Sequence, residues 1–210
     1  MKFKIINAGE SFGSTVIKTL IYGDSGAGKS YLSASAPKPL VLLTEMNGQA
    51  SIMHSNPEAD IIHITSDVVL GQVLKDIDAH PENWVKYETI IIDSLTEVQR
   101  LIKDRITNQG KTQMRLQDWG KLADNMRALI RRIRGLDKNV VCLALLSVTV
   151  DEDSGSRHHR PAFEGKKTSG EIAQFFNMVG YLFTVQEQKK KGDNIILHTV
   201  RNLMVEGPAR

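Results

Sequence analysis

Short apolar runs alternate along the chain with segments whose apolar residues recur at helical spacing. Leu70, Val73, Leu74 and Ile77 follow the i, i+3, i+4, i+7 pattern of one helix face. The runs that predict buried strands are Ile17–Tyr22, Leu40–Thr44, Asp60–Ile64, Thr89–Ile92 and Val140–Leu146. Because strands alternate with helices, the pattern predicts an α/β fold with a mainly parallel central sheet flanked by helices.

Two longer helices are predicted between the fourth and fifth of these strands, at Ser94–Asn108 and Gln117–Arg134. The apolar face of the second helix comprises Trp119, Leu122, Met126, Ile130 and Ile133. Side chains on one such face pack against the rest of the domain, so we expect all five in the core.

The C-terminal part of the chain has a different pattern, in which polar segments separate shorter apolar ones. Asp151–Lys167 is rich in Gly, Ser, His and charge, and predicts a long loop or an irregular hairpin. Glu171–Phe176 predicts a helix, and Tyr181–Gln186 and Ile195–Arg201 predict a C-terminal β-hairpin. With no internal repeat or Pro-rich linker, residues 1–210 are expected to form a single domain.

The composition is that of a folded globular protein, with 41% hydrophobic and 24% charged residues. Cys142 is the only cysteine and lies in an apolar run, which predicts a buried thiol, excludes a disulfide framework and favours a reducing compartment. The N-terminal residues lack the apolar stretch of a secretory signal, and Val140–Val150 is too short to span a bilayer. We therefore expect a cytoplasmic protein with no membrane partner.

A glycine-rich segment directly after the first strand matches the phosphate-loop pattern G-x-x-x-x-G-K-[ST] at every position. Its residues, all expected to bind the nucleotide, are Gly23, Asp24, Ser25, Gly26, Ala27, Gly28, Lys29 and Ser30. Glycines let successive N–H groups point at phosphate oxygens, and the helix that follows adds the positive end of its dipole. We expect Lys29 to reach the β- and γ-phosphates and Ser30 to bind Mg²⁺.

The fourth strand ends in a carboxylate, Asp93, at the edge of the sheet where ligands bind in such folds. Paired with the phosphate loop, Asp93 is predicted to hold Mg²⁺ through a coordinated water. Alone, an Asp at this position is also explained as the N-cap of the next helix.

Hydrolysis needs a group that orients or deprotonates water. Glu45 follows the strand Leu40–Thr44 at the same sheet edge and is the preferred base, with Glu97 as its rival. Ser147 follows the strand Val140–Leu146 and is a candidate γ-phosphate sensor, or an ordinary turn residue. The predicted catalytic residues are thus Lys29, Glu45 and Ser147.

In this order of parts the chain resembles the RecA/Rad51-type ATPase core, and most closely the short phage-encoded RecA-like proteins of single-strand annealing recombination. The segments that carry the resemblance are GDSGAGKS, LVLLTE, TIIIDS, DWGKL at Asp118–Leu122, and RPAFEGKK at Arg160–Lys167. The resemblance implies a RecA-like fold, ATP as the nucleotide, Glu45 as the catalytic glutamate and Ser147 as the γ-phosphate sensor.

The same resemblance implies partners. Residues 107–118 and 151–167 correspond to two DNA-binding loops, and Lys166 and Lys167 would reach ATP across a subunit interface. It further implies DNA-stimulated ATPase activity in phage recombination or annealing, and a homo-oligomer in the form of a ring or filament. A single-strand-binding protein is a candidate partner, and the host cytoplasm is the expected location.

Basic residues are concentrated in one part of the chain, although the net charge is only +3. Arg127, Arg131 and Arg134 share a helix face that can neutralise backbone phosphates, or can simply be solvated. The remaining candidates for single-stranded DNA binding are Lys111, Arg115, Arg157, Arg160, Lys166 and Lys167.

Two other functions are compatible with a phosphate loop. The first is a P-loop kinase acting on a small molecule, and the second is a nucleotide-dependent switch with little turnover. The effect of single-stranded DNA on ATP hydrolysis distinguishes the three.

Overall fold

An eight-stranded mixed sheet organises the fold in the computed structural model, which describes residues 16–151, 154–165, 168–191 and 194–206. The strands are β1 (Lys18–Gly23), β2 (Pro39–Leu43), β3 (Asp60–His63), β4 (Thr89–Asp93), β5 (Asn139–Val150), β6 (Arg157–Pro161), β7 (Met178–Lys191) and β8 (Asn194–Glu206). Their order is β3-β2-β4-β5-β1-β7-β8, and β6 pairs with β5 off this path.

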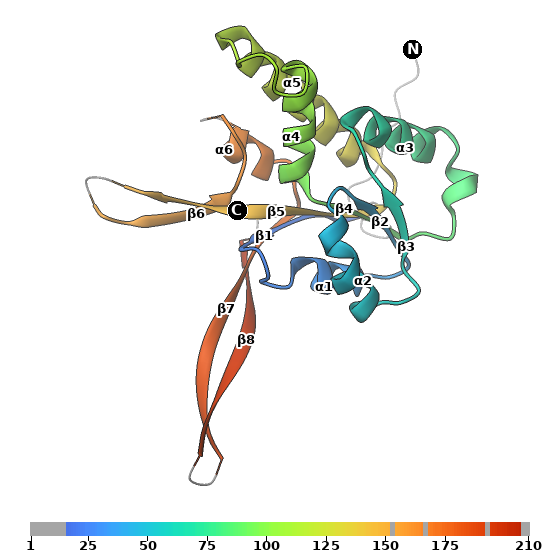
Figure 1. The fold of residues 1–210 in the computed structure, drawn as a ribbon. Helices are drawn as coiled ribbons and strands as arrows, with labels where there is room; N and C mark the ends of the chain where they lie inside the picture. Colours follow the sequence, from blue (N-terminus) through green and yellow to red (C-terminus); the bar gives the residue numbers. More distant parts are fainter. Residues whose placement is uncertain (1–15, 152–153, 166–167, 192–193, 207–210) are drawn as a thin grey trace, which may run out of the picture.

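Most neighbouring strands run parallel. All pairs from β3 to β7 are parallel, whereas β7–β8 and β5–β6 are antiparallel. The predicted α/β fold with a mainly parallel sheet and a C-terminal β-hairpin is therefore confirmed (Figure 1).

Helices cover both faces of this sheet. Their bounds are α1 (Lys29–Ala34), α2 (Gln49–Ser55), α3 (Asp67–Ala79), α4 (Leu95–Ile106), α5 (Leu116–Gly135) and α6 (Thr168–Ala173), with short 3₁₀ turns η2 (Met46–Gly48) and η3 (Pro81–Trp84). Figure 1 shows α1 and α2 on one side of the sheet and α3, α4 and α5 on the other. The sequence pattern did not predict α2.

Alternation along the central strands produces the two layers. In β2, Leu42 belongs to a large buried cluster that contains the apolar residues of α3, α4 and α5. Its neighbours Val41 and Leu43 pack instead with Ala34 of α1 and Ile52 of α2. Because successive strand residues point to opposite faces, a strand buried on both sides reads as a continuous apolar run.

Helix α5 confirms four of its five expected core residues. Leu122, Met126, Ile130 and Ile133 are almost completely buried. Trp119 is 38% exposed, so its assignment to the core was wrong. It lies near the start of α5, where the α4–α5 junction extends beyond the sheet (Figure 1), and Lys103 lies over its ring at 5.8 Å.

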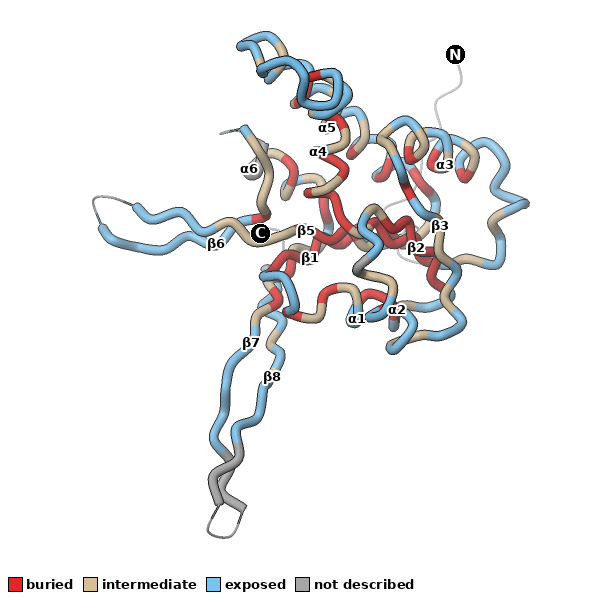
Figure 2. Tube along the Cα trace, in the orientation of Figure 1, coloured by how far each residue is buried: buried red, intermediate tan, exposed pale blue. Residues whose placement is uncertain are grey.

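Two hairpins extend from the sheet, and most of their residues are exposed in Figure 2. Strand β5 continues to Val150, and its last residues pair with β6, so the hairpin alternative for residues 151–167 is the correct one. The other hairpin, β7–β8, is also longer than predicted, and β7 joins the sheet beside β1.

Candidate nucleotide-binding site

The phosphate loop connects β1 to α1. Gly28 precedes the helix with φ of 100°, a left-handed conformation that favours glycine, and its carbonyl accepts from the Leu32 N–H at 2.9 Å. Inside the loop, the Ala27 N–H donates to the Asp24 carbonyl at 3.2 Å. The segment therefore has the turn-then-helix form that a phosphate-binding loop requires.

Lys29, the first residue of α1, turns back over the loop. Its Nζ donates to the carbonyl oxygens of Gly23 at 2.9 Å and Asp24 at 2.8 Å. The side chain is buried, and this desolvation lowers the pKa of Lys29, while the nearby carboxylates, first Asp93, oppose the shift. The ammonium is thus held against the backbone of the loop, and its contact with the β- and γ-phosphates stays a prediction.

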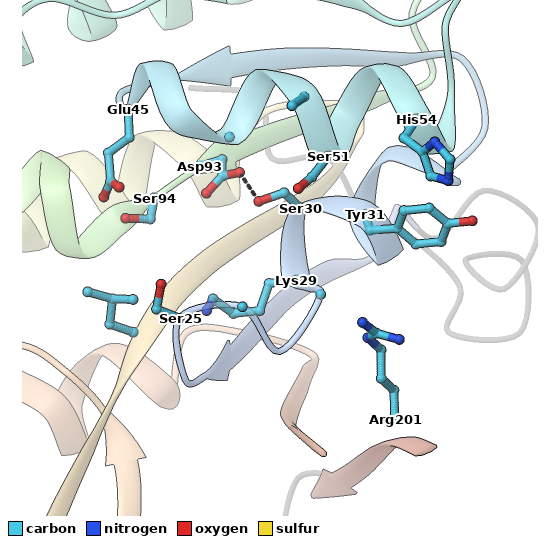
Figure 3. A pocket seen from close by; sticks show the side chains of 15 residues that line it. Ser25, Lys29, Ser30, Tyr31, Glu45, Ser51, His54, Asp93, Ser94 and Arg201 are labelled. Carbon is cyan, nitrogen blue, oxygen red and sulfur yellow. Dashed lines mark hydrogen bonds between the residues drawn. The ribbon is translucent and has the colours of Figure 1, made fainter. Parts of the chain in front are cut away.

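Ser30 and Asp93 meet at the edge of the sheet. The Ser30 hydroxyl donates to Asp93 Oδ2 at 2.6 Å, so the helix after β1 and the end of β4 are in direct contact (Figure 3). Thr44 holds the Asp93 backbone, because its N–H and hydroxyl both donate to the Asp93 carbonyl, at 2.7 and 2.8 Å. Burial raises the pKa of the Asp93 carboxyl, and the Ser30 hydrogen bond and Lys29 oppose this shift.

The position beside this pair is suited to Mg²⁺. A hydroxyl and a carboxylate are hard oxygen ligands of the kind this ion takes, and it keeps several waters besides. Gly48 of η2 borders this position: a Cβ there would lie 3.4 Å from Asp93 Oδ2 and 3.9 Å from Ser30 Oγ, and only 2.9 Å from Leu43 Cδ1. Ser30 and Asp93 therefore fit the ion that accompanies a nucleoside triphosphate.

Two glutamates stand at this end of the site. Glu45 follows β2 and lines the same cavity as Lys29 and Asp93. Burial raises the pKa of Glu45, and the negative charges of Glu97 and then Asp93 raise it further. Glu97, in the first turn of α4, also pairs with Arg100 at 2.9 Å. The geometry places Glu45 at the cavity as predicted, and the choice between the two glutamates as base stays a prediction.

Ser147 does not stand where the sequence placed it. We expected it at the end of a strand, but β5 runs on to Val150 and Ser147 pairs with Arg160 of β6. The β5 residue that lines the cavity is Leu145, which is level with Gly23 of the phosphate loop. The proposed sensor role of Ser147 therefore stays a prediction without a contact to support it.

The cavity around the phosphate loop has a volume of about 930 Å³ and reaches beyond the predicted residues. Sequence reasoning missed part of its lining, namely Tyr31, Ser51, His54, Ser94 and Arg201. Tyr31 directly follows the motif and could have been considered on that ground. Arg201 carries no such signal, because it comes near the loop only through the pairing of β8 with β7 and of β7 with β1.

The basic residues proposed for DNA binding do not form one surface of free charges. Arg127 donates to Glu171 of α6 at 2.6 Å and to Asp124 at 3.0 Å. Arg134 lies over the ring of Phe175 at 5.4 Å. Two of the three α5 arginines thus hold neighbouring residues of the fold.

The other candidates are more accessible. Exposed side chains are those of Arg131 on α5, Lys111 and Arg115 between α4 and α5, and Arg157 and Arg160 on β6. Lys166 and Lys167 lie outside the described residues. DNA binding by any of these residues stays a prediction.

The phosphate loop lies between a buried strand and a helix, and its serine donates a hydrogen bond to an aspartate at the end of another strand. These features define a P-loop nucleoside triphosphatase. The family comparison agrees: a model described as an AAA domain, AAA_24, matches residues 15–207. The chain belongs to this family of P-loop ATPase domains.

A solved structure similar to this chain is that of the flagellar accessory protein FlaH from Methanocaldococcus jannaschii. It is 14% identical in sequence, with 93% of this chain and 82% of that chain covered, at a TM-score of 0.44. No curated protein matches the chain significantly. Within the described residues, none of the helices is both long enough and apolar enough to cross a membrane.

Proposed function

We propose that this chain hydrolyses ATP with Mg²⁺ and uses the reaction to act on single-stranded DNA in recombination or annealing. The observation that carries the proposal is the contact of Ser30 with Asp93 in the same cavity as Glu45. In this proposal Ser30 and Asp93 act as the metal-binding pair and Glu45 acts as the base, all beside one phosphate loop.

Each residue has a defined task in hydrolysis. The loop N–H groups bind the phosphate oxygens, and Lys29 neutralises charge on the β- and γ-phosphates. Glu45 orients a water and accepts its proton while the water oxygen bonds to the γ-phosphorus. The bond between the γ-phosphorus and the oxygen that bridges it to the β-phosphate breaks, and ADP and phosphate are left. Mg²⁺ held by Ser30 and Asp93 would supply positive charge at the phosphate oxygens.

Contacts between α4 and the β5–β6 hairpin support coupling of this reaction to DNA. Thr96 of α4 accepts from the Leu145 N–H at 3.0 Å and donates to the Ala162 carbonyl at 3.2 Å. Gln99 donates to the Glu164 carbonyl at 3.0 Å and accepts from the Glu164 N–H at 2.6 Å. A shift of α4, which begins just after Asp93, would therefore move the base of a hairpin that carries two exposed arginines.

Single-stranded DNA is the expected partner, because basic residues on protruding hairpins and loops follow a flexible phosphate backbone well. A ring or filament of this chain, and a single-strand-binding protein, are the expected protein partners, from the RecA-like resemblance.

The test is ATP hydrolysis measured with and without single-stranded DNA, with duplex DNA as the comparison. Stimulation by the single strand supports the proposal. Phosphate transfer to a small metabolite, indifferent to DNA, would assign the chain to the kinases instead. Tight nucleotide binding with negligible turnover in either condition would assign it to the switches.

A further inference from the structure

The cavity continues past the phosphate loop to an end that hydrolysis does not use. In Figure 3, Glu45 and Asp93 stand at one end, Lys29 lies between, and Tyr31, His54 and Arg201 stand at the other. If the site hydrolyses a nucleoside triphosphate, as proposed above, the terminal phosphate faces Glu45. The nucleoside must then leave the loop toward Tyr31 and Arg201.

Arg201 comes from β8, yet it lies close to Gly28 of the phosphate loop and lines the cavity. A Cβ on Gly28 would stand 2.9 Å from its Nε and 3.1 Å from its Cδ. Gly28 thus leaves room for the arginine, in addition to adopting its left-handed backbone. The guanidinium points toward the cavity in Figure 3 and presents a planar cation there.

Tyr31 supplies an aromatic face at the same end. It follows Ser30 on α1, is 48% exposed, and its ring is tilted by 41° against His54 at 5.9 Å. The Ser55 hydroxyl donates to the Tyr31 carbonyl at 2.7 Å and so ties α2 to α1 beside the ring. An exposed tyrosine of α1 that lies beside α2 at the cavity wall is available to stack on a planar ligand.

We propose that Tyr31 and Arg201 bind the nucleobase, with the tyrosine ring and the guanidinium contacting its faces. Every base has a π-face, so these contacts favour a nucleotide over a bare polyphosphate without selecting one base. They make Tyr31 and Arg201 the residues that recognise the nucleoside, in a site whose other residues recognise phosphate.

A simpler role for Arg201 would be to neutralise phosphate charge. Arg201→Lys distinguishes the two roles, because lysine keeps the positive charge that would neutralise phosphate but lacks the planar surface that would contact a base. They differ also in the ligand affected, because inorganic tripolyphosphate has no base.

The experiment measures Kd by isothermal titration for ATP, GTP and inorganic tripolyphosphate, each with Mg²⁺. The full chain is compared with Arg201→Ala, Arg201→Lys and Tyr31→Ala. Lys75→Ala, which removes an exposed charge on α3, is the matched control. Thermal unfolding of each variant without ligand verifies that it is folded.

For both Arg201 variants and for Tyr31→Ala, we expect ATP and GTP affinity to fall by about 10-fold, with tripolyphosphate affinity unchanged. An equal loss of tripolyphosphate affinity in Arg201→Ala, restored in Arg201→Lys, would overturn the proposal and make Arg201 a phosphate contact. A loss confined to ATP would also overturn it, because that requires hydrogen bonds to the base edge. Failure of the unmutated chain to bind even tripolyphosphate would instead refute the proposed function itself.

Discussion

Ser30 and Asp93 are separated by 63 positions in the chain, and their side chains are joined by a hydrogen bond of 2.6 Å. The contact brings the phosphate loop and the end of β4 together at one edge of the sheet. The phosphate loop follows β1, and β1 and β4 are not neighbours in the sheet, since β5 lies between them. The site therefore depends on the whole central sheet, and variants of its residues test both binding and fold.

Lys29 is the first residue to test. Lys29→Ala removes the ammonium that lies over the loop, so nucleotide binding and turnover should both be lost. Titration with ATP and Mg²⁺ measures binding, and phosphate release measures turnover. Lys75→Ala should leave both at the level of the unmutated chain. Full turnover in Lys29→Ala would place the reaction elsewhere.

Asp93→Asn should separate stability from function. Because burial raises the folded pKa of Asp93, its protonated carboxyl contributes stability below the unfolded pKa, near 3.9. This contribution is lost as pH rises through the folded value and the carboxylate forms. Near neutral pH, the variant without ligand should therefore be more stable than the unmutated chain, with a higher Tm.

The gain should vanish in acid, below both pKa values, and the variant should lose the stabilisation that ATP and Mg²⁺ give the unmutated chain. Thermal unfolding from pH 3 to 8, with and without ligand, measures both effects. Strong stabilisation of Asp93→Asn by ATP and Mg²⁺ would remove Asp93 from the metal site.

Glu45→Gln should keep nucleotide binding and lower kcat by about 100-fold or more, because the amide cannot accept the proton. The pKa of Glu45 is raised, so the carboxylate is protonated at a higher pH than that of an ordinary glutamate. As pH is lowered, activity should therefore begin to fall at that higher pH. A pH profile of kcat measures this.

Glu97→Gln is the matched comparison. Its charge helps to raise the pKa of Glu45, so removing it should move the acid limb of the profile to lower pH with activity retained. If Glu97→Gln abolishes turnover and Glu45→Gln does not, the two assignments must be exchanged.

The basic residues divide into two groups with different expected effects. Arg157→Ala with Arg160→Ala, on the exposed hairpin, should weaken single-stranded DNA binding and reduce the slope of log K against log salt by about 1.4. Arg127→Ala should instead lower the unfolding temperature, because Glu171 loses its partner. Fluorescence anisotropy at several salt concentrations measures the effect on DNA binding, and thermal unfolding measures the effect on stability. An unchanged slope in the hairpin variant would mean that the β6 arginines are solvated and do not bind DNA.

The local sequence was sufficient for the phosphate loop and for the strands buried on both faces. The loop requires its glycines, Lys29 and Ser30 at fixed spacing, because backbone geometry is set within a few residues. Asp93 was predictable for a related reason, since the end of a buried apolar strand is readable and parallel strands share a carboxyl edge. The same local reasoning placed Leu122 and Ile133 in the core.

Tertiary structure decided what depends on long-range pairing. Ser147 became a mid-strand residue because β6 pairs with the end of β5, a contact that the local sequence does not specify. Trp119 has the right helical phase, but phase says nothing about where a helix outruns its sheet. Arg201 reaches the loop only through the pairing of β8 with β7 and of β7 with β1, contacts between residues far apart in the chain.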